Sequence, residues 1–108
     1  MVKKNITIDL KALDGRVFVG RSNGQRAREH FKLENCNEEN CHIVFLIPKN
    51  TMSVNSSFFL GLFGVDVQRI GDFDLFFKYV DISKVDERFK KQLEIAVKRS
   101  ISHTGYGL

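Results

Sequence analysis

The order of structural elements in this protein is decided by one stretch of its sequence, HIVFLIPKNTMSVNSSFFLGLFGV, which covers residues 42–65. Its first part, residues 43–47, is an unbroken run of β-branched, aliphatic and aromatic side chains that ends at Pro48. A run of this length is typical of a central strand buried on both faces of a sheet. The second part predicts a helix, because Ser56 or Ser57 can cap a following segment rich in large apolar residues. A buried strand followed by a buried helix indicates an α/β protein.

The sequence on the N-terminal side of this stretch predicts two strands and a helix. Apolar residues alternate with polar ones over residues 5–10, which indicates a half-buried strand. The dipeptide Asp14-Gly15 is a hairpin signal, so a second strand over residues 17–19 is expected to run antiparallel to the first. A capping-box pattern, serine followed three residues later by glutamine, then starts a helix over residues 22–33.

The sequence on the C-terminal side predicts one more strand and one more long helix. Gly71 is expected to end the second helix, and residues 72–77 are expected to form a short helical turn before a strand over residues 78–82. Ser83 is expected to cap the last helix, with Asp86 at the matching capping-box position. The resulting order predicts a small mixed sheet of about four strands, packed by three main helices in a single α/β domain.

Length and composition fit one globular domain. The chain has 108 residues, of which 43% are hydrophobic and 28% are charged. We expect the domain to cover residues 1–100 and residues 101–108 to form a flexible C-terminal tail. No apolar stretch approaches the roughly 18 residues that a membrane-spanning helix needs. The N-terminal residues hold no apolar signal-peptide core, which favours a cytoplasmic location and no membrane partner.

Two cysteines, Cys36 and Cys41, lie in a polar, asparagine-rich stretch. A secreted domain of this size usually carries more cysteines in a disulfide framework, so we expect reduced thiols, with a disulfide as the alternative. Together with His30 and His42 they would give four zinc ligands, but the gap between the cysteines is wider than in most structural zinc sites. The sequence therefore predicts no metal and no cofactor.

Three segments of the chain have sequence patterns that can be compared with those of known domain families. Residues 20–29 open a helix after a glycine, residues 52–64 join a small polar cluster to Ser-Phe and a helix ending in Phe-Gly, and residues 71–83 hold a turn and a strand. Together they resemble the STAS-like domain family of unassigned function, which is related in fold to bacterial anti-sigma factor antagonists. The resemblance covers roughly residues 13–100. It implies a bacterial regulatory adaptor that binds a partner protein, such as a serine-kinase-type ATPase or a sensor protein.

The resemblance also implies a contact surface, the Ser56–Gly64 helix. In antagonists that switch, an Asp-Ser-Ser-Gly cap starts this helix, and a kinase partner phosphorylates the first serine. Here Asn and Phe replace the Asp and the Gly, and Ser56 is the matching acceptor. A helix N-terminus is also a natural place for a hydroxyl cap alone, and this remains the alternative. The implied partner-binding residues are Asn55, Ser56, Ser57, Phe58 and Phe59.

Phenylalanine is the most informative feature of the composition, with ten Phe and no Trp. Phe58 and Phe59 are neighbours on one predicted helix, and Phe76 and Phe77 are neighbours on another, so the members of each pair point in different directions. A domain of this size seldom buries both members of both pairs. If one phenylalanine of a pair is exposed, it marks a surface for a partner or a second copy of the chain. If all four are buried, they are core residues.

Other functions leave weaker signals. No serine lies in a Gly-x-Ser-x-Gly elbow and no nucleophile has a neighbouring base, so we expect no catalytic residues and a protein that is not an enzyme. Arg21, Arg26 and Arg28 form a basic rim in one interpretation and a solvated helix face in another. With a net charge of +4, a small nucleic-acid-binding protein is the first alternative function. A homodimeric structural subunit is the second.

Overall fold

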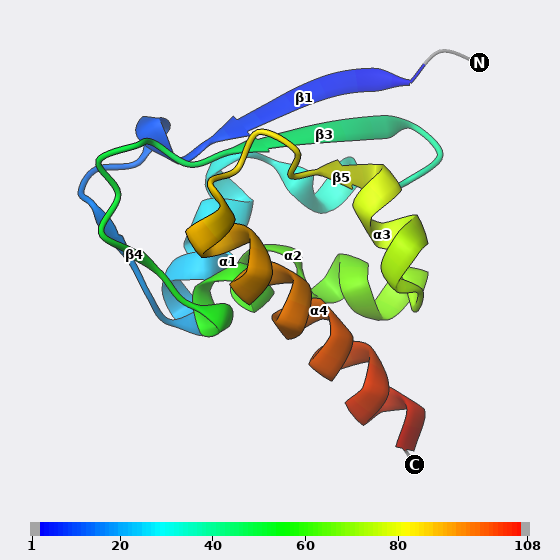
Figure 1. Ribbon diagram of the computed structural model, residues 1–108. Helices are drawn as coiled ribbons and strands as arrows, with labels where there is room; N and C mark the ends of the chain where they lie inside the picture. Colours follow the sequence, from blue (N-terminus) through cyan, green and yellow to red (C-terminus); the bar gives the residue numbers. More distant parts are fainter. Residues whose placement is uncertain (1–2, 107–108) are drawn as a thin grey trace.

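Helices and strands alternate along the chain in a computed structural model that describes residues 3–106, with side chains up to residue 102 (Figure 1). The strands are β1 (Lys4–Asp9), β2 (Val17–Phe18), β3 (Cys41–Leu46), β4 (Ser53–Val54) and β5 (Val80–Asp81). The α-helices are α1 (Arg21–His30), α2 (Ser56–Ile70), α3 (Phe73–Tyr79) and α4 (Glu87–Tyr106). Two 3₁₀ turns, η1 (Leu10–Ala12) and η2 (Leu33–Asn35), complete the described elements.

The strands form two small parallel sheets, and the prediction of a single small α/β domain is confirmed. β3 is the central strand of the larger sheet, between β1 and β5. The prediction of an antiparallel hairpin between the first two strands is wrong, because β2 pairs in parallel with β4 in a separate sheet. The N–H of Met52 donates to the carbonyl oxygen of Arg16 at 2.7 Å beside this pair. β4 has only two residues, too few to produce an alternating sequence pattern.

One face of the larger sheet forms part of the core. Along β3 the buried residues Cys41, Ile43 and Phe45 alternate with the half-buried Val44 and Leu46. The prediction that this strand is buried on both faces is therefore wrong. The alternation shows that the helices cover only one face of the sheet, which is unusual for parallel strands.

α2 is the central helix, in contact with α1, α3 and α4. The ring of Phe59 lies 6.1 Å from that of Phe45 on β3, while the ring of Phe58 lies 5.5 Å from that of Phe18 on β2. Because the two neighbours pack against different sheets, Phe58 is only 1% exposed and Phe59 is fully buried. Neither member of this pair is exposed, so of the two alternatives full burial applies here and both are core residues. That these two side chains bind a partner stays a prediction, which their burial does not favour.

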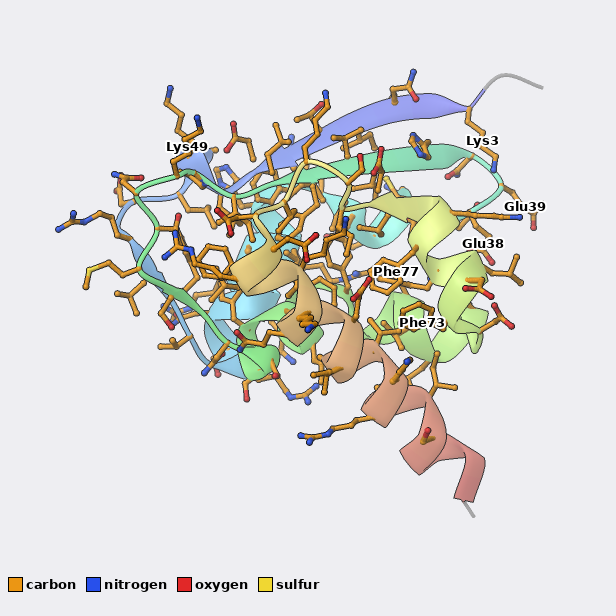
Figure 2. All side chains as sticks on the ribbon, in the orientation of Figure 1. Lys3, Glu38, Glu39, Lys49, Phe73 and Phe77 are labelled. Atoms are coloured by element: carbon orange, nitrogen blue, oxygen red, sulfur yellow. The ribbon has the colours of Figure 1, made fainter. Side chains whose placement is uncertain are left out.

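The second phenylalanine pair joins α3 to the rest of the core. Phe76 is buried against Phe63 of α2, and Phe77 is half-buried. Phe73 and Phe77 lie between α3 and α4 (Figure 2), with their ring centroids 4.9 Å apart. The ammonium of Lys98 on α4 lies 5.4 Å from the centre of the Phe73 ring. Both pairs therefore contribute to packing between elements.

The caps of the helices differ from the predicted ones at three places. Asn55, and neither serine, caps α2, because its Oδ1 accepts a hydrogen bond from the N–H of Phe58 at 2.9 Å. α1 begins at Arg21 after Gly20, which has a φ of 91°, so the predicted capping box lies within the helix. Asp86, and not Ser83, precedes the first turn of α4 and accepts from the N–H of Arg88.

The predicted end of α2 is confirmed, whereas the predicted start of a loose C-terminal tail is wrong. Gly71 ends α2 with a φ of 66°, as expected from its sequence position. α4 continues to Tyr106, so residues 101–106, predicted to be a loose tail, are helical. Residues 107 and 108 of that tail lie outside the described residues.

α1 and α2 cross in direct backbone contact at Gly24 and Gly61. A Cβ atom on Gly24 would lie 2.8 Å from the Cα of Gly61 and would collide with the carbonyl oxygen of Phe58. A Cβ atom on Gly61 would collide with the carbonyl oxygen of Arg21. Any other residue at either position would therefore force the two helices apart.

Polar contacts fix this crossing one helical turn to either side. At one side the N–H of Gly20 donates to Oδ1 of Asn55 at 3.3 Å. At the other side Nη1 of Arg28 donates to the carbonyl oxygen of Leu62 at 2.9 Å and to Oδ2 of Asp66 at 2.7 Å. Residues 20, 24 and 28 are four apart, so all three face the same helix.

The glycine crossing predicts opposite effects for two substitutions on the same helix. Gly61→Ala should lower the free energy of unfolding by at least about 2 kcal/mol, because the methyl group has no room. Gly64→Ala should raise it by about 0.5–1 kcal/mol, because alanine favours the helix and the nearest atoms to its Cβ lie 3.8 Å away. Urea unfolding followed by circular dichroism tests both, and equal midpoints would contradict the crossing.

The buried carboxylate of Asp66 predicts a second pair of outcomes. Its two oxygens bind Arg28 at 2.7 Å and Arg69 at 2.9 Å, and its side chain is 1% exposed. Asp66→Asn should cost about 3 kcal/mol in urea unfolding, because two arginines lose their anionic partner in the interior. Glu38→Gln, which removes the exposed outer partner of Arg69, is the control and should cost less than about 1 kcal/mol. If both substitutions change the free energy of unfolding by less than about 1 kcal/mol, the buried ion pairs of Asp66 do not stabilise the fold.

Candidate functional site

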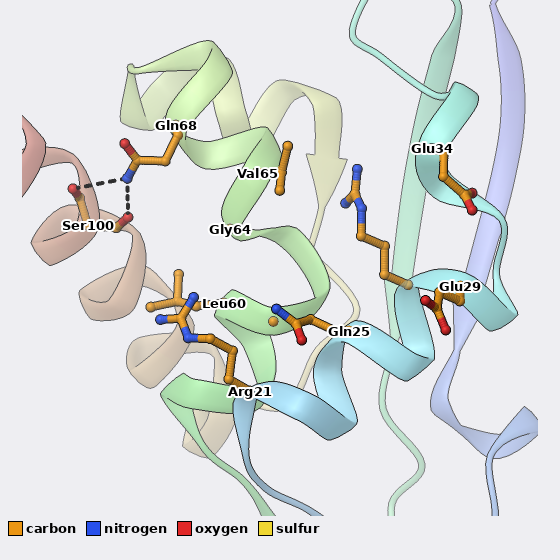
Figure 3. Close-up of a pocket in the computed structure, with 11 residues that line it drawn as sticks. Arg21, Gln25, Glu29, Glu34, Leu60, Gly64, Val65, Gln68 and Ser100 are labelled. Carbon is orange, nitrogen blue, oxygen red and sulfur yellow. Dashed lines mark hydrogen bonds between the residues drawn. The ribbon is translucent and has the colours of Figure 1, made fainter.

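A stripe of four residues is the part of α2 that faces away from the sheets. Ser56, Leu60, Gly64 and Gln68 follow one another at four-residue spacing, and none of them is fully buried. Figure 3 shows this side of α2 between α1 and α4. Because most apolar residues of α2 pack on the core, this stripe and the exposed residues beside it, Ser57, Val65 and Arg69, are the surface that α2 can offer to another molecule.

Two adjoining hollows lie along this stripe, and we call them together the α2 groove. The first has a volume of about 740 Å³ and the second about 360 Å³. The first is lined by Arg21, Gln25, Arg28, Glu29, Glu34, Leu60, Gly61, Gly64, Val65, Gln68 and Ser100. The second is lined by Arg21, Ser56, Leu60, Gln68, Ala96, Arg99 and Ser100.

The floor of the groove is apolar and exists because α2 carries a glycine there. A Cβ on Gly64 would have only Nη1 of Arg21 and Cβ of Leu60 as near neighbours, both at 3.8 Å. The missing side chain therefore leaves open space above the helix backbone. Val65, beside it, is 62% exposed, which is high for a residue on the central helix of the core.

The walls of the groove are held by contacts between helices. On one side the hydrogen bonds of Arg28 to Leu62 and Asp66 hold α1 against α2. On the other side Nε2 of Gln68 donates to Oγ of Ser100 at 2.8 Å and joins α2 to α4, as the dashed lines in Figure 3 show. The groove is thus formed by three helices that are fixed relative to one another.

Two arginines of the groove differ from the other arginines around α2. Arg28 and Arg69 are both bound to Asp66. Arg21 and Arg99 are exposed, and neither makes an ion pair with any residue in the part of the chain that the structure describes. The guanidinium of Arg21 lies next to Leu60 (Figure 3) and lines both hollows.

The structure separates the partner-binding residues predicted from the sequence. Asn55 is half-buried and holds Gly20 and Phe58 through its amide oxygen. Ser56 is half-buried at the first position of α2 and lines the second hollow, while Ser57 is exposed. Phe58 and Phe59 belong to the core. Of the five, only Ser57 is exposed, while Asn55 and Ser56 are half-buried and the two phenylalanines are buried.

The predicted basic rim of Arg21, Arg26 and Arg28 does not form one surface. Arg21 and Arg28 face the α2 groove. Arg26 lies on another side of α1 and lines a separate hollow beside Phe18 and His30. Only Arg21 of the three has a groove-facing guanidinium without an ion pair among the described residues.

Sequence reasoning missed most of the residues that form the groove. The available signal was the interruption of an apolar helix by the small or polar residues Ser56, Gly64 and Gln68, which lie on one side of it. Arg99 and Ser100 gave no signal, because only folding brings α4 beside α2. The lining residues that lie outside both the predicted contact helix and the predicted basic rim are Gln25, Glu29, Glu34, Val65, Gln68, Ala96, Arg99 and Ser100.

Cys36 and Cys41 are free, buried thiols. Burial raises the pKa of Cys36 to about 11, and the hydrogen bond and the charge of the neighbouring Cys41 add to the effect. The hydroxyl of Tyr79 is buried in the same region, has no hydrogen-bond partner among the described residues, and its pKa is raised by burial and by Asp66. Within residues 3–102, no three His, Cys, Asp or Glu side chains are grouped so as to hold a metal ion.

The raised pKa of Cys36 predicts low reactivity of its thiol. At pH 8 an ordinary cysteine is partly ionised, whereas a thiol of pKa about 11 is almost entirely protonated. Alkylation of Cys36 by iodoacetamide at pH 8 should therefore be slower in the folded protein than in urea by on the order of a hundredfold. Peptide mass spectrometry over time measures both rates. Rapid modification of the folded protein would show that the thiol is not protected.

Comparisons of the chain with protein-family models, with curated proteins and with solved structures give no match. None of the described helices is both long enough and apolar enough to cross a membrane. The resemblance to the STAS-like family therefore rests on the three sequence segments and stays a prediction. The structure itself shows a small α/β domain with a groove along its central helix.

Proposed function

We propose that this chain is a non-enzymatic protein-interaction module, a bacterial regulatory adaptor of STAS-like type, which binds a partner protein through the α2 groove. One observation supports this most strongly. The half-buried Leu60 and Gly64 and the exposed Val65 form an apolar floor of the groove, on a helix that otherwise buries most of its apolar residues in the core. The proposed contact surface is thus this stripe instead of the two buried phenylalanines.

The distribution of side chains in the groove favours a protein partner. Apolar atoms form the centre, and charged groups such as Arg21, Arg99, Glu29 and Glu34 stand at the edges. Protein interfaces have the same arrangement, with an apolar centre and a polar rim. The hollows are open along the surface between two helices, a shape that suits a helix or an extended segment.

Ser56 gives the same surface a means of regulation under this proposal. Its side chain lines the second hollow together with Arg21 and Arg99. A phosphate on this serine would add about −1.5 to −2 charges at the edge of the contact surface. If the resemblance holds, a serine-kinase-type ATPase or a sensor protein in the bacterial cytoplasm would be the partner that adds or reads this group.

The test is site-specific photo-crosslinking in cells of the source organism. A photoreactive phenylalanine analogue at Gln25, an exposed residue in the wall of the groove, should form a covalent adduct with one partner protein. The same analogue at Thr7, an exposed residue of β1, should not form that adduct. The adduct should also be lost when Gly64→Gln fills the floor of the groove.

Other results would contradict the proposal. An adduct with a second copy of the chain would favour the homodimer, and an adduct with RNA or DNA would favour the nucleic-acid alternative. The absence of any adduct at Gln25, or identical adducts at Gln25 and Thr7, would exclude the groove as the contact surface. Mass spectrometry of the gel-purified adducts distinguishes these outcomes.

A further inference from the structure

We infer that the segment that occupies the α2 groove is an acidic peptide segment of the partner, with a carboxylate between Arg21 and Arg99 and an apolar side chain over Leu60 and Gly64. This inference rests on the proposed function and adds the chemistry of the partner. It follows from the charges that line the two hollows.

Arg21 supplies the first part of the argument. Its Nη1 lies 3.8 Å from the position that a Cβ on Gly64 would occupy, so the guanidinium borders the apolar floor where the two hollows meet. Arg28, two turns further along the same helix, is bound to a carboxylate, whereas Arg21 pairs with no acidic side chain among the described residues. A guanidinium carries five N–H donors in a planar fork that matches a carboxylate.

Arg99 supplies the second part. It comes from α4 on the other side of the stripe and lines the second hollow together with Arg21. None of the described residues that line this hollow is acidic. Two positive charges that line one hollow repel each other, and a carboxylate between them would offset this repulsion while forming charge-assisted hydrogen bonds.

The other end of the groove has the opposite charge and gives the bound segment a direction. Glu29 and Glu34 line the first hollow and are exposed. A complementary segment therefore has an acidic residue over the second hollow, an apolar residue over Gly64, and a neutral or basic residue near the two glutamates. A nucleic-acid backbone, which is anionic along its whole length, fits this pattern less well because it would also meet the glutamates.

The experiment uses a phage-displayed library of random 12-residue peptides as the probe. The library is panned on the intact wild-type chain after depletion on the Gly64→Gln variant, so that only peptides dependent on the groove floor remain. The selected peptides should be enriched in Asp or Glu next to an apolar residue. Their affinity, measured by fluorescence anisotropy, should fall at least about tenfold for Arg21→Gln and for Arg99→Gln, the loss expected for a charged hydrogen bond.

Arg26→Gln is the matched control, since it removes the same charge from another side of α1 and should leave the affinity unchanged. An equal loss with Arg26→Gln would show a general charge effect and overturn the inference. Peptides that depend on Gly64 but show no acidic enrichment and tolerate both groove variants would also overturn it, while binding at the groove would stand. No peptide that distinguishes wild type from Gly64→Gln would overturn the proposed function together with the inference. Circular dichroism of each variant establishes that the fold is retained.

Discussion

The backbone contact between Gly24 and Gly61 is the constraint on which the rest of the arrangement depends. Side chains normally keep two packed helices 8–10 Å apart, and here neither helix has one at the crossing point. The close approach brings Arg28 within reach of Asp66, and Gly20 within reach of Asn55. Because Gly20 follows β2 and Asn55 follows β4, the same crossing also fixes the small parallel sheet. One helix contact thereby positions a sheet, a buried ion pair and a wall of the groove.

This arrangement explains why the same helix is both core and surface. α2 packs its phenylalanines against two different sheets, so most of its circumference is buried. α1 and α4 cover its sides but leave the stripe that contains Gly64 uncovered. The charges around that stripe are unequal, with Arg21 and Arg99 at one end and two glutamates at the other. A groove that is positively charged at one end and negatively charged at the other favours a partner that binds in one orientation.

Local sequence patterns predicted most helices and strands, but they did not predict the contacts between segments that are distant in the sequence. The apolar run that became β3 and the C-cap at Gly71 have signals within a few residues. β4 has no such signal, since its two residues become a strand only through pairing with β2. The cap of α2 could not be assigned to Asn55 from the sequence, because asparagine and serine are equally common N-cap residues and two serines follow it. In the candidate site, Ser56 was proposed from the family resemblance, whereas Arg99 lines the groove only because α4 packs beside α2.

The amide oxygen of Asn55 has a consequence for motion. This single atom accepts hydrogen bonds from the N–H of Phe58 in α2 and from the N–H of Gly20 at the start of α1. A local opening that breaks the first bond therefore weakens the second, so the leading turns of two helices are expected to fray as one unit. Ser56 is the next residue along the chain. The residue next to Ser56 in the chain therefore joins the starts of α1 and α2 through one oxygen atom.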